Sequence, residues 1–114
     1  VALEQRQWER AEAHYRQALE LLVEFNDRYS QASTYGQLGL LAEAQQRWPQ
    51  AREHLLHALE LFVEFKDEHS IGVTLRNLAL LWQGSGDAGV PAGVARVLGV
   101  TVEQAEELLR KAGE

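Results

Sequence analysis

The sequence contains no cysteine and no methionine, and only two of its 114 residues are proline. Without cysteine the chain has no disulfide, no thiol nucleophile and no cysteine ligand for a metal, which fits a reducing compartment. Its apolar runs fall well short of the roughly 18 residues that a membrane-spanning helix needs. Basic residues are outnumbered, 11 against 17 acidic ones, and the net charge of −6 disfavours nucleic acid. We therefore expect a cytoplasmic protein that binds neither membrane nor nucleic acid.

The most informative feature of the chain is an internal repeat with a period of forty residues. The segment ALELLVEFNDRYS, which begins at Ala18, returns as ALELFVEFKDEHS from Ala58. By direct count about 17 of 40 paired positions are identical. A period of this size is typical of solenoids built from stacked structural units. We therefore predict that the chain is a segment of a repeat array.

The segments between the turn signals have the apolar spacing of amphipathic α-helices. After Pro49, apolar residues recur every three or four positions, as one face of a helix requires. Proline suits the first helical turn, where its missing N–H leaves no bond unmade. Because short connections force successive helices to run antiparallel, we predict helix hairpins stacked side by side. The predicted helices are about 9–25, with Phe25 on its apolar face, 28–46, 49–65 and 68–83, and residues 1–7 are read as the tail of a preceding helix.

Two aspartates mark the predicted helix starts. Asp27 and Asp67 lie where a short polar side chain can accept a bond from free N–H groups of the next helix. Ser30 and Ser70 are alternative caps. Small residues at fixed places, among them Gly39, are sites where a larger side chain would hold the helix axes apart.

The stretch LGLLAEAQQRWPQAREHLLHALEL resembles a tetratricopeptide repeat. That family's motif combines a Leu-Gly pair, a turn aromatic, an alanine, a bulky residue four positions on and another alanine three beyond. The resemblance covers about residues 1–87, although the units have 40 residues rather than 34. It implies an all-α fold, in which antiparallel helix hairpins stack as a short right-handed solenoid with a C-terminal helical cap. The matching residues are Leu38, Gly39, Trp48, Ala51, Leu55 and Ala58, and Trp8, Ala11, Tyr15 and Ala18 in the earlier copy.

The family frame divides the chain into units. Residues 1–27 form a partial unit, 28–67 a full unit and 68–87 the start of a third, and 88–114 form a divergent C-terminal helical cap. Longer units of this kind are familiar in kinesin light chains and in bacterial signalling ATPases of the NB-ARC and maltose-regulator type. The resemblance thus suggests the C-terminal sensor or scaffold part of a multidomain bacterial signalling protein.

The last thirty residues break the repeat and predict two short helices. One runs from about Pro91 to Leu98 and the other from Thr101 or Val102 to about Ala112, with Thr101 as N-cap. Their spacing also resembles a DNA-binding helix-turn-helix. The second helix is rich in glutamate, which is unfavourable against phosphate or bases. A polar cap on an open array is therefore the favoured interpretation.

Reactive chemistry finds little support in the sequence. His54 and His57 share a helix face and are candidate metal ligands, but no third ligand lies at a fixed spacing. The GSGDAG stretch lacks the Lys-Ser/Thr of a phosphate loop. The carboxylates are distributed along solvated helix faces, with no sign of a paired acid and base. We predict that the chain is not an enzyme and has no catalytic, cofactor or metal site.

The remaining class of function is binding of a protein or peptide. In tetratricopeptide arrays the first helices of successive units line a concave groove that takes a peptide or a partner helix. Only Arg76 and Asn77 resemble the family's clamp for a C-terminal carboxylate, so an amphipathic or extended peptide fits better. The groove residues that the resemblance implies are Ser33, Gly36, Gln37, Leu40, Glu43, Val73, Arg76, Asn77, Leu80 and Gln83.

An alternative function is architectural. If the first helix lacks a neighbour, its apolar face is free to self-associate, and exposed patches of several hundred Å² favour such contacts. This predicts a homodimer, or end-to-end assembly, with no separate ligand. The residues expected at this contact are Leu3, Tyr15, Leu19 and Leu22.

Overall fold

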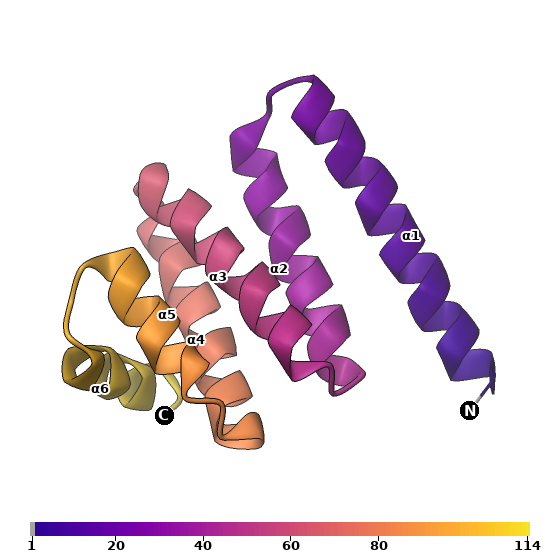
Figure 1. The fold of residues 1–114 in the computed structure, drawn as a ribbon. Helices are drawn as coiled ribbons and strands as arrows, with labels where there is room; N and C mark the ends of the chain where they lie inside the picture. Colours follow the sequence, from indigo (N-terminus) through magenta and orange to yellow (C-terminus); the bar gives the residue numbers. More distant parts are fainter. Residues whose placement is uncertain (1) are drawn as a thin grey trace.

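A computed structural model describes the backbone of residues 2–114 and the side chains of residues 4–114, and within that range all regular structure is helical. Helices α1 to α5 alternate in direction along the chain, with α1 at one end of the array, and α6 lies across the other end beside α5 (Figure 1). The predicted all-α helical repeat fold is confirmed. The helices are α1 (Ala2–Glu24), α2 (Arg28–Ala44), α3 (Trp48–Glu64), α4 (Glu68–Ser85), α5 (Gly89–Leu98) and α6 (Val102–Ala112).

The turns between the helices recur every twenty residues. Asn26, Gln46 and Lys66 have φ angles of 56°, 58° and 55°, and Gly86 continues the series at 68°. In the left-handed region this angle reverses the chain after each helix. The forty-residue sequence repeat therefore consists of two helix-and-turn halves of equal length.

The predicted N-caps are confirmed. The carboxylates of Asp27 and Asp67 each accept a hydrogen bond from the backbone N–H three residues on, at Ser30 and Ser70, with 3.1 Å between nitrogen and oxygen in both. At α6, the side chain of Thr101 accepts a bond from the Gln104 N–H, while the Gln104 side chain accepts from the Thr101 N–H. These reciprocal bonds satisfy N–H groups that a helix start leaves free.

The larger of the two buried apolar clusters runs from α2 to α6. Its fully buried side chains come from α3, α4, α5 and α6, so the C-terminal helices belong to the core and do more than cover it. At 25 cal/mol per Å², burial of each such side chain contributes roughly 1.5–3 kcal/mol. These largest fully buried side chains are Leu55, Leu59, Leu78, Leu81, Val90, Val94 and Leu109.

The N-terminal helix differs from the prediction. Helix α1 is continuous from Ala2 to Glu24, so the predicted boundary near Trp8 is wrong. The equivalent stretch of the next unit turns at Gln46 and starts a new helix at Trp48 with Pro49 in its first turn, whereas the first copy has Glu9 in the proline position. Glutamine, arginine and glutamate are good helix formers, so the helix continues through.

Phe25 also departs from its predicted place. Its side chain is 75% exposed, although the sequence pattern puts it on the apolar face of its helix. Among the helices described, α1 packs only against α2. Phe25 therefore has less cover than its counterpart Phe65, which is 44% exposed.

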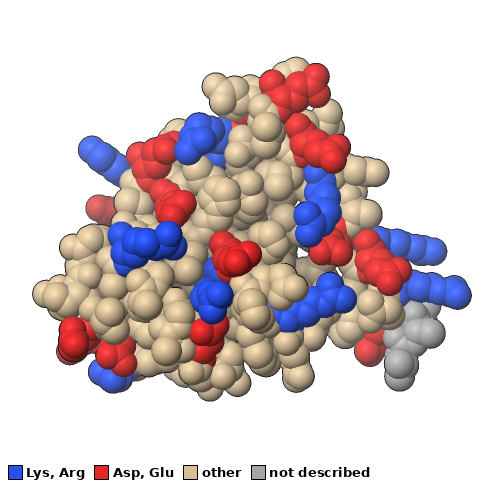
Figure 2. All heavy atoms as spheres, in the orientation of Figure 1, with Lys and Arg blue, Asp and Glu red and all other residues tan. Residues whose placement is uncertain are grey.

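On the face of the molecule seen in Figure 2, acidic and basic side chains are interspersed over the helices.

None of the helices in the described range is both long and apolar enough to span a bilayer.

Candidate functional site

A groove of about 260 Å³ lies between α2 and α4, the first helices of successive units. Six of the predicted groove residues line it, namely Ser33, Gly36, Gln37, Leu40, Val73 and Asn77. The remaining lining comes from Phe62 of α3 and from His69, Ser70 and Thr74 of α4, which the resemblance did not indicate. The helix spacing could have found the three residues of α4, because positions three and four apart share a helix face.

The walls of the groove are spaced as one face of each helix. Ser33, Gln37 and Leu40 follow one another at four and three positions along α2, and Val73 and Asn77 face them from α4. Leu40 is 38% exposed and Val73 48% exposed. The groove therefore offers apolar contact beside amide groups that can donate and accept hydrogen bonds.

Gly36 interrupts the α2 wall. A Cβ built at this position would meet nothing within 4 Å, so packing does not require a glycine here. A glycine inside a helix costs about 1 kcal/mol relative to alanine. What the missing side chain provides is room for another backbone to approach α2 closely.

The lining is nearly free of charge. The ten residues that line the groove include no Lys, Arg, Asp or Glu, and His69 is the only titratable one among them. Arg76, a candidate cation of a carboxylate clamp, does not line the groove, and its guanidinium donates to the backbone oxygen of Glu114 across 3.5 Å. The lining thus favours an uncharged segment over a terminal carboxylate.

The other predicted groove residues lie outside this groove. Arg76 and Gln83 face the C-terminal end of the chain, where the Gln83 amide lies close to Gly113. Leu80 is 41% exposed. Glu43 is partly buried, and this burial raises the pKa of its carboxyl group. The structure therefore brings six of the predicted residues together in the groove and places the other four outside it.

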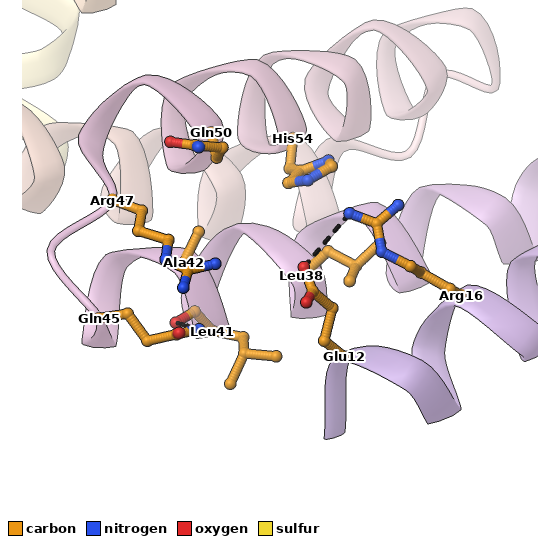
Figure 3. Close-up of a pocket in the computed structure, with 9 residues that line it drawn as sticks. All are labelled: Glu12, Arg16, Leu38, Leu41, Ala42, Gln45, Arg47, Gln50 and His54. Carbon is orange, nitrogen blue, oxygen red and sulfur yellow. Dashed lines mark hydrogen bonds and ion pairs between the residues drawn. The ribbon is translucent and has the colours of Figure 1, made fainter. Parts of the chain in front are cut away.

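A second hollow, between α1, α2 and α3, is too small for a ligand. Its volume of about 30 Å³ holds one or two water molecules. Arg16 is paired with Glu12 at 3.2 Å and points toward His54 (Figure 3). Burial lowers the pKa of His54, and the positive charge of Arg16 lowers it further. This hollow lies where side chains of α1 face those of α2 and α3.

The two histidines considered as metal ligands pack on an aromatic ring. The ring of Tyr35 stacks on His57 with 3.9 Å between centroids and on His54 with 6.2 Å. No group of three or more His, Asp or Glu side chains suited to a metal occurs in the part of the chain that the structure describes. Contact between α2 and α3 accounts for both histidines.

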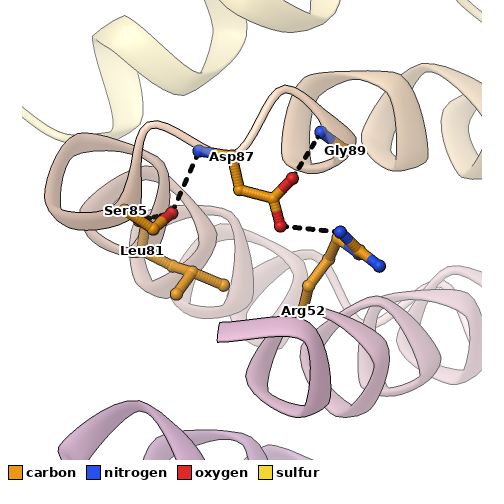
Figure 4. A network of polar contacts seen from close by, with 5 residues as sticks. All are labelled: Arg52, Leu81, Ser85, Asp87 and Gly89. Atoms are coloured by element: carbon orange, nitrogen blue, oxygen red, sulfur yellow. Dashed lines mark hydrogen bonds and ion pairs between the residues drawn. The ribbon is translucent and has the colours of Figure 1, made fainter. Parts of the chain in front are cut away.

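An ion pair that sequence reasoning missed ties the C-terminal helices to the array. The guanidinium of Arg52 lies 2.7 Å from the carboxylate of Asp87, and the other oxygen of Asp87 accepts a bond from the Gly89 N–H (Figure 4). The two residues are 35 positions apart. The forty-residue repeat relates positions 40 apart, so it does not indicate this contact. This contact holds the start of α5 against α3.

The residues predicted for self-association lie on α1. Tyr15, Leu19 and Leu22 are partly buried, and Leu3 is outside the described side chains. Among the side chains described on α1 and the turn after it, the most exposed large apolar ones are Leu21, Val23 and Phe25. Self-association itself stays a prediction.

The repeated hairpins, their twenty-residue turns and the groove between successive first helices define a helical repeat protein. The family model described as "Tetratricopeptide repeat" matches residues 1–62 and 30–88. The chain belongs to the tetratricopeptide repeat family. Repeats of this family are generally protein-interaction modules and are typically non-catalytic. No curated protein and no solved structure matched the chain.

Proposed function

We propose that this chain is a protein-interaction module that binds a peptide segment of its partner in the groove between α2 and α4. The main observation in support of this proposal is the groove itself. Six of its ten lining residues are those that the resemblance to the family implies. The gap at Gly36 supports the close approach of a peptide backbone.

The chemistry of the lining favours an uncharged amphipathic segment. Leu40 and Val73 offer apolar contact, while Gln37 and Asn77 offer amides that can pair with a peptide backbone. A partner segment with alternating apolar and polar residues matches both. A strongly charged segment finds no counter-charge among the lining residues.

We further propose that the module is the sensor or scaffold part of a multidomain bacterial signalling protein of the cytoplasm. The forty-residue unit supports this, because it resembles the long repeats of signalling ATPases. A sequence upstream of the array that encodes a nucleotide-binding ATPase domain would support the proposal, and an unrelated domain there would count against it.

The groove can be tested with a peptide display library selected on the chain. The informative variant is Gly36→Leu, which fills the gap in the α2 wall. The matched control is Gly72→Leu, because Gly72 is also helical with nothing within 4 Å of a Cβ but does not line the groove. We expect selected peptides to lose binding to Gly36→Leu by at least about tenfold, which corresponds to 1.4 kcal/mol, and to keep it with Gly72→Leu. Peptides that bind both variants equally would show that the groove is not the site.

A further inference from the structure

We propose that the outer face of α1 is a docking site for a partner helix with the chemistry of α2. Such a helix is amphipathic, begins with a basic and an aromatic residue, and carries a small residue where it crosses α1. This surface is separate from the groove between α2 and α4, so the inference does not depend on the proposed function.

The face is defined by comparison with α3. Helix α2 covers one side of α3, where Leu61 is 3% exposed in a cluster with Ala58 and Ala32. Forty residues earlier, the equivalent Leu21 is 55% exposed, because α1 packs only against α2 among the helices described. The side of α1 that corresponds to the α2-facing side of α3 is thus uncovered.

The contacts that hold α2 on α3 involve three residues at the end of α3. Glu64 accepts two hydrogen bonds from the Arg28 guanidinium, each across 3.0 Å. The ring of Tyr29 meets Phe65 edge to face at 5.4 Å between centroids, and its hydroxyl donates to Asp67. The first turn of α2 is therefore fixed through its arginine and its tyrosine.

All three of these receptor residues recur on α1 and its turn. Glu24, Phe25 and Asp27 occupy the positions of Glu64, Phe65 and Asp67. Phe25 is 75% exposed and Leu21 lies beside it on the same helix face. Ala18 keeps the small residue that lets helices approach closely at Ala58. Helix α1 and its turn thus carry the residues that hold an Arg-Tyr helix start, except that Leu22 stands in the place of Phe62, whose ring also meets Tyr29.

The geometry argues against a second intact copy as the occupant. In each copy Arg28 and Tyr29 are already engaged by Glu64 and Asp67, and α2 is packed between α1 and α3. A second chain therefore cannot offer its own α2 without unfolding. The surface fits a helix that is free to present these groups.

The probe for this site is a peptide of residues 27–46, made helical by Ser33→Glu and Gln37→Lys joined through a lactam. Both positions are exposed in α2. Binding to the full chain is followed by fluorescence anisotropy. We expect saturable binding that Leu21→Asp weakens at least about tenfold, while Val23→Asp changes it less than about twofold. Val23 is a matched control, because it is 57% exposed two residues away on another side of α1.

A charge exchange tests the proposed pairing. Glu24→Arg in the chain should weaken binding about two- to fivefold, as expected for an exposed ion pair, and Arg28→Glu in the peptide should restore it. Gly36→Leu should leave binding unchanged, which separates this site from the groove. Three results would each overturn the proposal: no saturation up to about 1 mM, equal binding by the Leu21→Asp variant, or a dimer of the chain that Leu21→Asp dissociates in sedimentation.

Discussion

Gly39 of α2 lies so close to Leu55 of α3 that a Cβ at position 39 would stand 2.7 Å from Leu55 Cγ and 3.2 Å from its backbone nitrogen. Leu55 is fully buried, so its side chain has no free space into which to move. The spacing between the two helices of the full unit is therefore set by the absence of a side chain at Gly39.

Gly39→Ala should destabilise the fold by about 1–3 kcal/mol, because overpacking outweighs the gain of about 1 kcal/mol in helix propensity. Gly36→Ala in the same helix meets nothing within 4 Å and should stabilise by about 0.5–1 kcal/mol. Urea unfolding of the two variants measures both effects. Stabilisation by Gly39→Ala would show that the hairpin tolerates a wider spacing.

The close helix packing at Gly39 could be predicted from the sequence, because the forty-residue repeat places a small residue there in each unit. The same repeat located α2, α3 and α4 to within two or three residues and indicated both aspartate caps. The repeat wrongly predicted a turn near Trp8, where α1 is continuous. A repeated sequence does not require a turn where the proline is missing and where no second described helix packs against α1.

The groove was predictable in part, for a geometric reason. Residues of α2 and α4 that face each other follow from helix periodicity, and six of the ten proposed positions lie together. Where the groove ends depends on α6 and the C-terminus, whose approach to Arg76 and Gln83 has no equivalent in the repeat. The pair Arg52 and Asp87 lies outside the repeat register as well.

His54 should make stability depend on pH. Burial and the nearby Arg16 lower its pKa, so the folded state favours the neutral ring, while the ring in the unfolded chain binds a proton near its ordinary value of 6.5. Stability is therefore complete above that pH and declines as the pH falls toward the lowered pKa of the folded state. Glu12 and Glu53 oppose the shift but do not reverse it.

The measurement is the urea midpoint between pH 7.5 and 5.5. His54→Gln should flatten the decline over this range, because one fewer proton is taken up on unfolding. His14→Gln is the control, since His14 is the exposed equivalent of His54 in α1. An equal slope in wild type and His54→Gln would assign the pH dependence to other groups.

Asp87 should contribute to stability through two contacts at once. Asp87→Ala removes the pair with Arg52 and the acceptor for the Gly89 N–H, and we expect a loss of about 1–2 kcal/mol. Asp87→Asn keeps an oxygen for Gly89 and should lose less. A double-mutant cycle with Arg52→Ala isolates the ion pair, whose coupling should stay below about 1 kcal/mol because both side chains are partly exposed.

Helix α6 should behave as part of the core. Leu109 is fully buried in the cluster that includes Leu78 and Leu81, whereas its neighbour Leu108 is 38% exposed. Leu109→Ala should cost about 2–4 kcal/mol through lost contacts and a cavity. Leu108→Ala should stay within about 0.5 kcal/mol.

Deletion of residues 90–114 extends this test to the whole C-terminal cap. It removes four fully buried side chains, Val90, Val94, Ala105 and Leu109, and uncovers the side of Leu56 that packs against Gly93. Because the larger apolar cluster loses this share, we expect a broadened urea curve with a lower slope and reduced solubility. A truncated chain that unfolds as sharply as the full chain would show instead that the repeats before Val90 fold independently.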